Sequence, residues 1–398
     1  MDFGLKTEDW LNLRLISNNK KMKVYLDNAA TTAMDKEVIS AMISVLENNF
    51  GNPSSVHSFG RSSRAIIEKA RKKVAAYINA VPAEIFFTGG GTEADNMILR
   101  SAVQDLKVKH IITSAIEHHA VIDTSNLISK NENVALSLVN IDEKGYVDLT
   151  HLEQLLKDNQ DKKTLVSLMH ANNEIGNLLP LKKVADLCKL YGALFHSDTV
   201  QTIGHYRFDV RALNIDFLTC SAHKFHGPKG TGFLFVNSNL QLKPIITGGA
   251  QERNMRAGTE NIAGIVGLEK AMEIAHRDME SHENYIKGLK YYMIDELKKA
   301  LPEANFNGDP LGDSLYTVLN VRFPHSDMDE MLIYNLDIEG VATSGGSACS
   351  SGSAVGSYVL SHLGVDLNQP SLRFSFSKFN TKEEIDYTIK VIKELFNR

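Results

Sequence analysis

The sequence has little cysteine, no long apolar run and no cluster of basic residues, and each absence excludes a class of protein. Three cysteines in 398 residues cannot form a disulfide framework, so we expect a reducing compartment. No apolar run approaches the ~18 residues of a membrane-spanning helix. Residues 1–21 carry acidic groups and lack the apolar segment of a secretory signal. The net charge of −5 gives no support to nucleic-acid binding. We therefore expect a cytoplasmic protein that binds neither membrane nor nucleic acid.

What is present is the pattern of an ordinary α/β protein. Hydrophobic residues make up 43% of the chain and charged residues 23%, which excludes a disordered, collagen-like or coiled-coil protein. We expect strands at 85–87, 110–113, 134–139, 165–169, 193–196, 216–220 and 231–236. We expect helices at 60–78, 92–103, 120–129, 149–157 and 181–191. Strands that alternate with helices favour a mostly parallel sheet. A helical stretch at 262–300 and weaker patterning from Leu315 onwards indicate a smaller α+β domain.

Polar residues gather directly after five of the predicted strands. These clusters are Gly89–Thr92, Glu117–His119, Asn172 with Asn173, Asp198 with Gln201, and Ser221 with His223 and Lys224. Ligands of open parallel sheets bind outside the carboxyl ends of the strands. One shared site at that edge of the sheet is therefore the favoured interpretation.

The glycine turn Gly89-Gly90-Gly91-Thr92 lies between a predicted strand and a predicted helix. Free backbone N–H groups and the positive end of a helix suit a phosphate, although a tight turn that needs a positive φ is an equally good explanation. A dinucleotide fingerprint is a further alternative, because Gly89–Ala94 fits G-x-G-x-x-A and Glu117 lies near the end of the next strand.

Lys224 and Asp198 each follow a strand that leads to the same edge. A lysine there can form a Schiff base if burial or a nearby cation lowers its pKa, although most lysines are surface groups. Lys229, among glycines before the next strand, is the less favoured candidate. A carboxylate at Asp198 could hold a protonated pyridine nitrogen. The alternative for Asp198 is a helix N-cap.

Cys349 differs from the other two cysteines. Cys188 and Cys220 have apolar neighbours and are expected in the core. In residues 344–357, twelve of fourteen residues are Gly, Ser or Ala, and Cys349 is one of the other two. The alternatives for Cys349 are an incidental exposed thiol and a nucleophile on a mobile loop.

Together these motifs resemble the cysteine desulfurases of the class V aminotransferase group, which are fold-type I pyridoxal-phosphate enzymes. The resemblance runs from Val24 to about Lys393 and is closest to the housekeeping and nitrogen-fixation type (group I). The blocks that carry it are Val24-Tyr-Leu-Asp-Asn-Ala-Ala-Thr-Thr, Thr88-Gly-Gly-Gly-Thr-Glu-Ala-Asp-Asn, Glu117-His-His-Ala-Val, His196-Ser-Asp-Thr-Val-Gln, Ser221-Ala-His-Lys, Arg256-Ala-Gly-Thr-Glu-Asn, Ser347-Ala-Cys-Ser-Ser and Leu372-Arg-Phe-Ser.

The resemblance implies a role for each candidate residue. Lys224 would carry pyridoxal phosphate, Asp198 would pair with the ring nitrogen, Gln201 with the ring hydroxyl, and His118 would stack on the ring and move protons. The phosphate would be held by Gly91, Thr92, Ser221, His223 and, from the partner subunit of a homodimer, Thr259. Arg373, helped by Asn172, would bind the substrate carboxylate, and Asn172 would also contact the cofactor. Cys349 would take sulfur from L-cysteine as a persulfide and pass it to an acceptor, such as an iron–sulfur scaffold protein. No metal is implied.

The resemblance also implies the pyridoxal-phosphate transferase fold and its domains. We expect an N-terminal extension and arm at 1–31, a large cofactor domain with a mostly parallel seven-stranded sheet at 32–279, and a small α+β domain at 280–398. The hypotheses that compete with a desulfurase are a selenocysteine lyase or aminotransferase of the same fold, a nicotinamide-dependent oxidoreductase, and an inactive relative that only binds.

Overall fold

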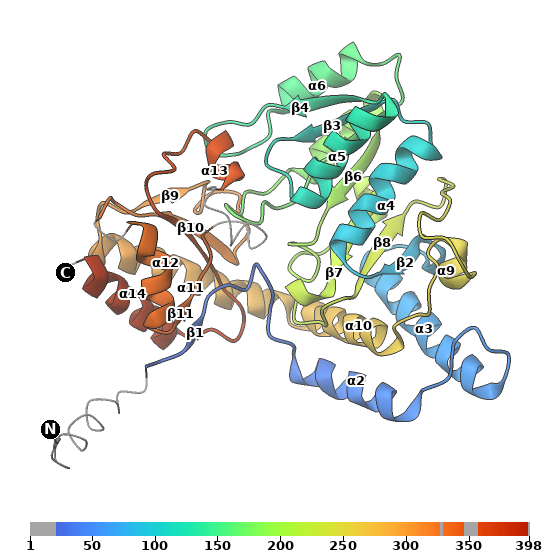
Figure 1. Ribbon diagram of the computed structural model, residues 1–398, viewed down its shortest axis with the longest axis horizontal. Coiled ribbons are helices and arrows are strands. Elements are labelled where there is room, and N and C mark those ends of the chain that lie inside the picture. Colours follow the sequence, from blue (N-terminus) through green and yellow to red (C-terminus); the bar gives the residue numbers. More distant parts are fainter. Residues whose placement is uncertain (1–20, 327–328, 346–356, 397–398) are drawn as a thin grey trace, which may run out of the picture.

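The computed structural model describes residues 21–326, 329–345 and 357–396 (Figure 1). Within these residues the largest sheet has the strand order β2 (Ile85–Thr88), β8 (Gly232–Val236), β7 (Phe217–Ser221), β6 (Leu194–Asp198), β5 (Thr164–Ser167), β3 (His110–Ser114) and β4 (Ala135–Val139). Neighbouring strands from β7 to β4 are parallel, and β8 is antiparallel to both β2 and β7. The predicted seven-stranded, mostly parallel sheet is confirmed.

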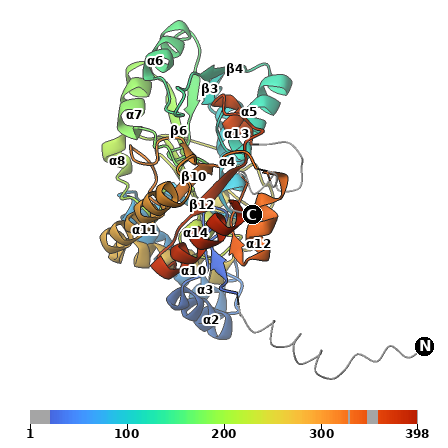
Figure 2. The same ribbon diagram turned by 90° about the vertical axis from the view of Figure 1, so that its left-hand side faces the viewer.

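Helices cover both faces of this sheet, which explains why its strands are apolar. One face packs against α4 (Gly91–Gln104) and α5 (His119–Glu132). The other packs against α3 (Ser58–Tyr77), α6 (Leu149–Asp158), α7 (Leu181–Leu190) and α10 (Ile262–Arg277). Figure 2 shows α6 and α7 on the side opposite α5. Cys188 and Cys220 are buried in this core, as predicted.

Helix α2 (Lys36–Asn48) was not predicted from the sequence, because Ile39, Ile43 and Leu46 place apolar residues on its exposed side as well and no single apolar stripe results. Asp35 caps its start by accepting a hydrogen bond from the backbone N of Glu37. Only Val38 and Val45 of this helix are buried. The short helices of the same part of the chain are η1 (Pro82–Glu84), α8 (Val210–Leu213), η2 (Ala222–Lys224) and α9 (Gln251–Asn254).

A second core lies between the C-terminal elements and the N-terminal arm, which we define as residues 21–32. The C-terminal elements are α11 (Met279–Ala300), β9 (Asn305–Asn307), β10 (Val318–Arg322), η3 (Asp329–Met331), α12 (Leu332–Ile338), β11 (Val341–Ala342), α13 (Tyr358–His362), β12 (Ser371–Ser375) and α14 (Lys382–Phe396). Strands β12, β10 and β9 form an antiparallel sheet, and β1 (Val24–Tyr25) of the arm pairs with β11 (Figure 1). The expected domain limits at residues 31 and 279 stay predictions.

The arm therefore packs with the small domain, and it also runs toward the carboxyl edge of the large sheet. Val24 and Leu26 of the arm are buried in the second core. The backbone N of Ser375 donates to Leu26 O (2.7 Å), which holds the arm beside β12. None of the described helices is both long enough and apolar enough to cross a membrane.

Candidate active site

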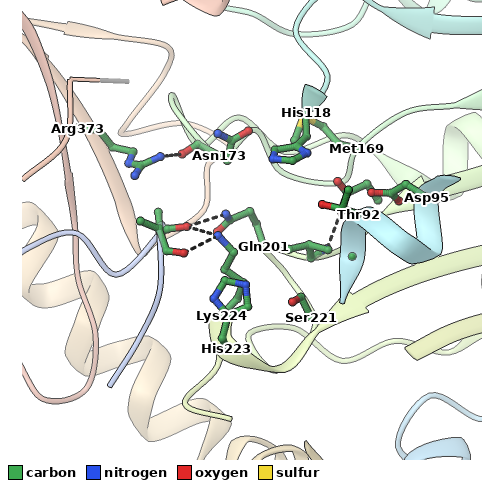
Figure 3. Close-up of a pocket in the computed structure, with 15 residues that line it drawn as sticks. Thr92, Asp95, His118, Met169, Asn173, Gln201, Ser221, His223, Lys224 and Arg373 are labelled. Carbon is green, nitrogen blue, oxygen red and sulfur yellow. Dashed lines mark hydrogen bonds between the residues drawn. The ribbon is translucent and has the colours of Figure 1, made fainter. Parts of the chain in front are cut away.

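A cavity of about 240 Å³ lies at the carboxyl ends of the large sheet, where the sequence predicts a shared site. Its lining residues are Ala29, Ala30, Gly91, Thr92, Asp95, His118, Met169, Asn173, Asp198, Val200, Gln201, Ser221, His223, Lys224 and Arg373 (Figure 3). The structure thus brings together most of the residues predicted from five separate strand ends. Arg373, on β12 of the small sheet, lies across the cavity from the strand ends of the large sheet (Figure 3).

The start of α4 forms one wall of the cavity and has the features of an anion site. Its N-cap residue, Gly90, has φ 145°, a conformation that favours glycine, and no side chain caps the helix. A Cβ on Gly91 would lie 2.5 Å from Cγ2 of Val200, so glycine is also required there for packing. Open N–H groups at a helix start, next to the side chains of Thr92 and Ser221, suit a phosphate.

Asp198 lies at the floor of the cavity as a buried carboxyl group without a basic side chain bonded to it among the described residues. Its Oδ1 accepts a hydrogen bond from the backbone N of Val200 (2.8 Å). Burial, together with the charge of nearby Asp95, raises the pKa of Asp198 to about 6. No described helix begins directly after Asp198, since the next one starts at Val210 with Asp209 as its cap. The N-cap interpretation of Asp198 is therefore wrong.

Asp95 is a floor residue that the sequence interpretation missed. It lies on α4, is fully buried, and its Oδ1 has no hydrogen-bond partner within the described residues. The Nε2 atom of His196 is 3.5 Å away. Burial raises the pKa of Asp95 to about 7 and lowers that of His196 to about 4. A sequence signal existed, because Asp95 falls on the same helical face as the apolar residues Ile98 and Leu99.

Lys224 and Gln201 point toward the same stretch of the N-terminal arm (Figure 3). Lys224 Nζ donates to the carbonyl oxygens of Ala29 (2.6 Å) and Ala30 (3.0 Å). Gln201 Nε2 donates to Ala29 O (3.1 Å). The arm contacts were not predicted, because a backbone carbonyl leaves no trace in the identity of a residue. Lys224 itself comes from η2, directly after β7.

Two histidines line the cavity in neutral form. His118 is the N-cap residue of α5, and its Nδ1 accepts the backbone N–H of Ala120 (3.1 Å). Burial lowers the pKa of His118, so the neutral ring carries its proton on Nε2. His223 Nδ1 lies 3.1 Å from Thr31 Oγ1 of the arm, and burial and the Lys224 charge lower its pKa to about 4.

Arg373 is almost fully buried, with 1% of its side chain exposed. Its Nη1 donates to the carbonyl oxygen of Asn173 (2.9 Å), and its Nη2 donates to Asp27 Oδ1 (2.8 Å). Asn172, the neighbour that the sequence favoured, is directed elsewhere: its side chain donates to Ile116 O and accepts from the backbone of the following turn. Asn172 thus shapes the loop, and Asn173 lines the cavity.

Two predicted residues lie apart from this group. Thr259 lines a separate depression beside Gly89 and Arg256. Cys349 lies outside the described residues. Glu117, the acid of the dinucleotide alternative, is buried and accepts hydrogen bonds from Ser114 Oγ (2.7 Å) and Met169 N (2.8 Å). Both of its oxygens are engaged inside the protein, so this alternative has no ribose ligand.

Comparison with known proteins gives the family. Residues 24–388 match the aminotransferase class-V family, so the chain belongs to that family. The cysteine desulfurase IscS of Dictyoglomus turgidum is 42% identical over 382 residues, 95% of each chain. The cysteine desulfurase IscS of Methanosarcina thermophila is 41% identical over 94% of this chain and 92% of its own.

Solved structures give the same fold. A NifS-like protein superposes with a TM-score of 0.87 at 37% identity, over 94% of this chain and 100% of its own. The apo cysteine desulfurase of Thermococcus onnurineus has a TM-score of 0.84 at 25% identity and covers all of both chains. A protein named SspA, solved in complex with cysteine, has a TM-score of 0.75 at 29% identity, over 90% of this chain and all of its own.

Proposed function

We propose that this protein is a pyridoxal-phosphate-dependent cysteine desulfurase, which converts L-cysteine to L-alanine and leaves the sulfur as a persulfide on Cys349. The observation that carries the proposal is that Lys224, Asp198, His118 and Arg373 line one cavity. These are an amine, an acid, a neutral imidazole and a carboxylate-binding cation. Chemistry on an amino acid needs this set of groups, and the family supplies the reaction class.

The cavity fits pyridoxal phosphate on independent grounds. Asp198 is a buried acid that lacks a basic side chain to pair with among the described residues, and a protonated ring nitrogen would supply the missing cation and lower its pKa. The uncapped start of α4 offers backbone N–H groups to the phosphate, beside Ser221 and His223. Lys224 would hold the cofactor covalently, and Gln201 its ring hydroxyl. When bound, the cofactor supplies an electron sink for a carbanion at the substrate Cα.

The protein groups then have distinct tasks. Arg373 would bind and orient the substrate carboxylate, because a guanidinium matches that geometry. Lys224 would hold the proton removed from Cα, and His118 would hold or deliver a proton at Nε2. Asn173 and Met169, which also line the cavity, would exclude water from the reacting atoms.

The sulfur-transfer step uses Cys349. Its thiolate would attack the substrate sulfur, so that a sulfur–sulfur bond forms while the substrate C–S bond breaks. The carbon fragment takes up a proton and leaves as L-alanine. The thiol and L-cysteine therefore balance the persulfide and L-alanine without an external oxidant. The persulfide would pass to an acceptor protein, such as an iron–sulfur scaffold, in the cytoplasm.

A homodimer is part of the proposal. Four apolar side chains on α2, on α3 and between them face solvent: Leu46, Phe50, Val56 and Phe59 are 66%, 78%, 87% and 57% exposed. The rings of Phe50 and Phe59 lie 5.2 Å apart, so they form a patch of the kind that protein interfaces cover. Gln251 Nε2, in the segment before Thr259, donates to Ser54 Oγ (3.3 Å) beside this patch, so a dimer that covered the patch would bring Thr259 near the partner. Sedimentation of the purified protein should give twice the mass of the chain.

A selenocysteine lyase or an aminotransferase of the same fold is the second candidate, favoured by the same cavity. Under that alternative Cys349 is dispensable. Purified wild-type protein should be yellow with bound cofactor and should produce equal amounts of alanine and sulfide from L-cysteine and a reductant. Cys349→Ser should stay yellow and release almost no sulfide.

Matched lysine variants test the cofactor site. Lys224→Ala should lose the yellow colour, whereas Lys229→Ala, which changes an exposed lysine nearby, should keep both colour and activity. Wild-type sulfide release by Cys349→Ser would contradict the persulfide step. A colourless wild type that binds no pyridoxal phosphate would contradict the whole proposal.

A further inference from the structure

The ion pair between Asp27 and Arg373 places a carboxylate of the protein on the group that would bind the carboxylate of the substrate. Arg373 Nη2 and Asp27 Oδ1 are 2.8 Å apart, and the side chains are 1% and 21% exposed. The pair joins residues 346 positions apart in the sequence. It therefore links the arm to β12 at the wall of the cavity.

The backbone holds Asp27 in this position. Asp27 bridges to Ser375, and the backbone N of Ala29 donates to Ser375 Oγ (2.8 Å). Tyr25 Oη donates to the carbonyl oxygen of Thr31 (2.8 Å), which bends the arm around Asp27. The backbone at Asp27 is thus held by several contacts that do not involve Arg373.

Arg373 keeps an unused donor although it is buried. Its Nε has no hydrogen-bond partner within the described residues. An unpaired buried N–H is costly, and a bound ligand that carries an acceptor removes the cost. The guanidinium is therefore held on two sides, by Asp27 and by Asn173 O, and Arg373 lines the cavity that a second acceptor would enter.

We propose that the Asp27 carboxylate competes with the substrate carboxylate for Arg373. Asp27 would thereby position the guanidinium and set the affinity of the site for a substrate carboxylate. This inference rests on the proposed role of Arg373. When the substrate binds, two carboxylates share one guanidinium. Their repulsion weakens binding of the substrate and of the product alanine alike, which keeps the product from being trapped.

The size of the effect follows from the spacing of the charges. Two carboxylates on one guanidinium stand about 6 Å apart, where the repulsion in a protein interior would correspond to about a hundredfold in affinity. Asp27 is partly exposed, so solvent screens this repulsion, and we expect about tenfold. Asp27→Asn keeps an oxygen for Arg373 Nη2 and removes only the charge.

The test compares Asp27→Asn with Asp35→Asn. Asp35 pairs with Lys378 (2.6 Å), is 14% exposed, and joins the same part of the chain to the segment after β12 without touching Arg373. Both variants lose an ion pair of similar burial, so a purely structural role predicts the same result for both.

The affinity is measured by calorimetric titration with 3-mercaptopropionate, and with its neutral amide as the matched ligand, on the full chain with and without pyridoxal phosphate. We expect Asp27→Asn to bind the acid about tenfold more tightly than wild type, and Asp35→Asn to bind it as wild type does. In the sulfide assay the KM of Asp27→Asn should fall by a similar factor while kcat stays within about twofold, the pattern of a uniform change in binding.

Unchanged or weaker binding of the acid by Asp27→Asn would overturn the inference, and so would equal changes in both variants. The calorimetric titration measures binding of the carboxylate ligand and does not depend on turnover. A protein that releases no sulfide but shows the tenfold shift would contradict the proposed function and leave this inference intact. A protein that releases sulfide but shows no tenfold change in affinity for Asp27→Asn would support the proposed function and contradict this inference.

Discussion

A buried ion pair between Arg71 and Glu252 fixes the turn that leads to the segment of Thr259, and its removal gives the sharpest stability prediction. Arg71 Nη1 and Nη2 donate to the two carboxylate oxygens of Glu252 at 2.7 and 2.9 Å. The side chains are 2% and 3% exposed. The guanidinium also lies 4.7 Å from the ring centroid of Phe87 and donates to Ile85 O (2.8 Å).

Glu252 also binds the backbone of strand β2. Its Oε2 accepts the backbone N–H of Phe87 (2.8 Å). Glu252, Arg253 and Asn254 all have positive φ values, a conformation that costs energy for residues other than glycine. Burial lowers the pKa of Arg71, but the bonds to Glu252 and Glu68 outweigh burial and raise it, so the group stays charged.

Arg71→Met should cost about 3–5 kcal/mol of unfolding free energy, because it leaves the Glu252 carboxylate buried without its partner. Adding Glu252→Gln should recover about 2 kcal/mol of this loss, since no buried charge then remains and the glutamine oxygen still accepts from Phe87 N. The double variant is thus expected to be more stable than the Arg71→Met single variant.

Urea denaturation followed by circular dichroism measures these differences, with Arg253→Met as the control. Arg253 pairs with Glu68 from the same turn, but the side chains are 38% and 43% exposed, so its loss should cost at most about 1 kcal/mol. A double variant that is less stable than Arg71→Met would refute the argument from buried charge.

Two further predictions concern buried groups whose titration gives opposite slopes. Burial raises the pKa of Glu117 to about 8, so between pH 5 and 8 the folded state keeps a proton that the unfolded state has lost. The stability of wild type relative to Glu117→Gln should therefore fall as pH rises from 5 to 8, by at most about 1.4 kcal/mol per pH unit. Burial lowers the pKa of Lys290 to about 7, so the unfolded state binds this proton more tightly than the folded state does. The stability of wild type relative to Lys290→Met should therefore rise between pH 7 and 10, by at most about 1.4 kcal/mol per pH unit. Urea midpoints at each pH measure both slopes, and a flat difference profile would contradict either assignment.

The sequence predicts the large sheet and most of the cavity for one physical reason. Buried parallel strands read as short apolar runs, and their carboxyl ends meet at one edge, so the polar residues that follow them must converge. Asp198, Ser221, His223 and Lys224 are found in this way. The order of the strands did not matter for this prediction, because every parallel strand leads to the same edge.

The remaining site residues depend on contacts that have no local pattern. Asp27 and Arg373 meet only because the arm pairs with the small domain, far away in the sequence. Asn172 and Asn173 are identical in type, and the backbone of their loop alone decides which one faces the cavity. Asp95 is placed by the rotation of α4 about its axis, which the helical periodicity encodes but which a search of strand ends overlooks.

The acids around the cavity connect the stability of this fold with its proposed chemistry. Asp95, Glu117 and Asp198 are buried, and their pKa values are raised, so the protein without a ligand carries destabilised carboxyl groups at its centre. A cationic ring nitrogen at Asp198 would offset part of this cost, and a ligand that binds only the folded state adds its binding free energy to the stability. The cost of burying Asp198 without a cation would then contribute to cofactor binding, whereas Asp95 and Glu117 would keep their own cost of burial.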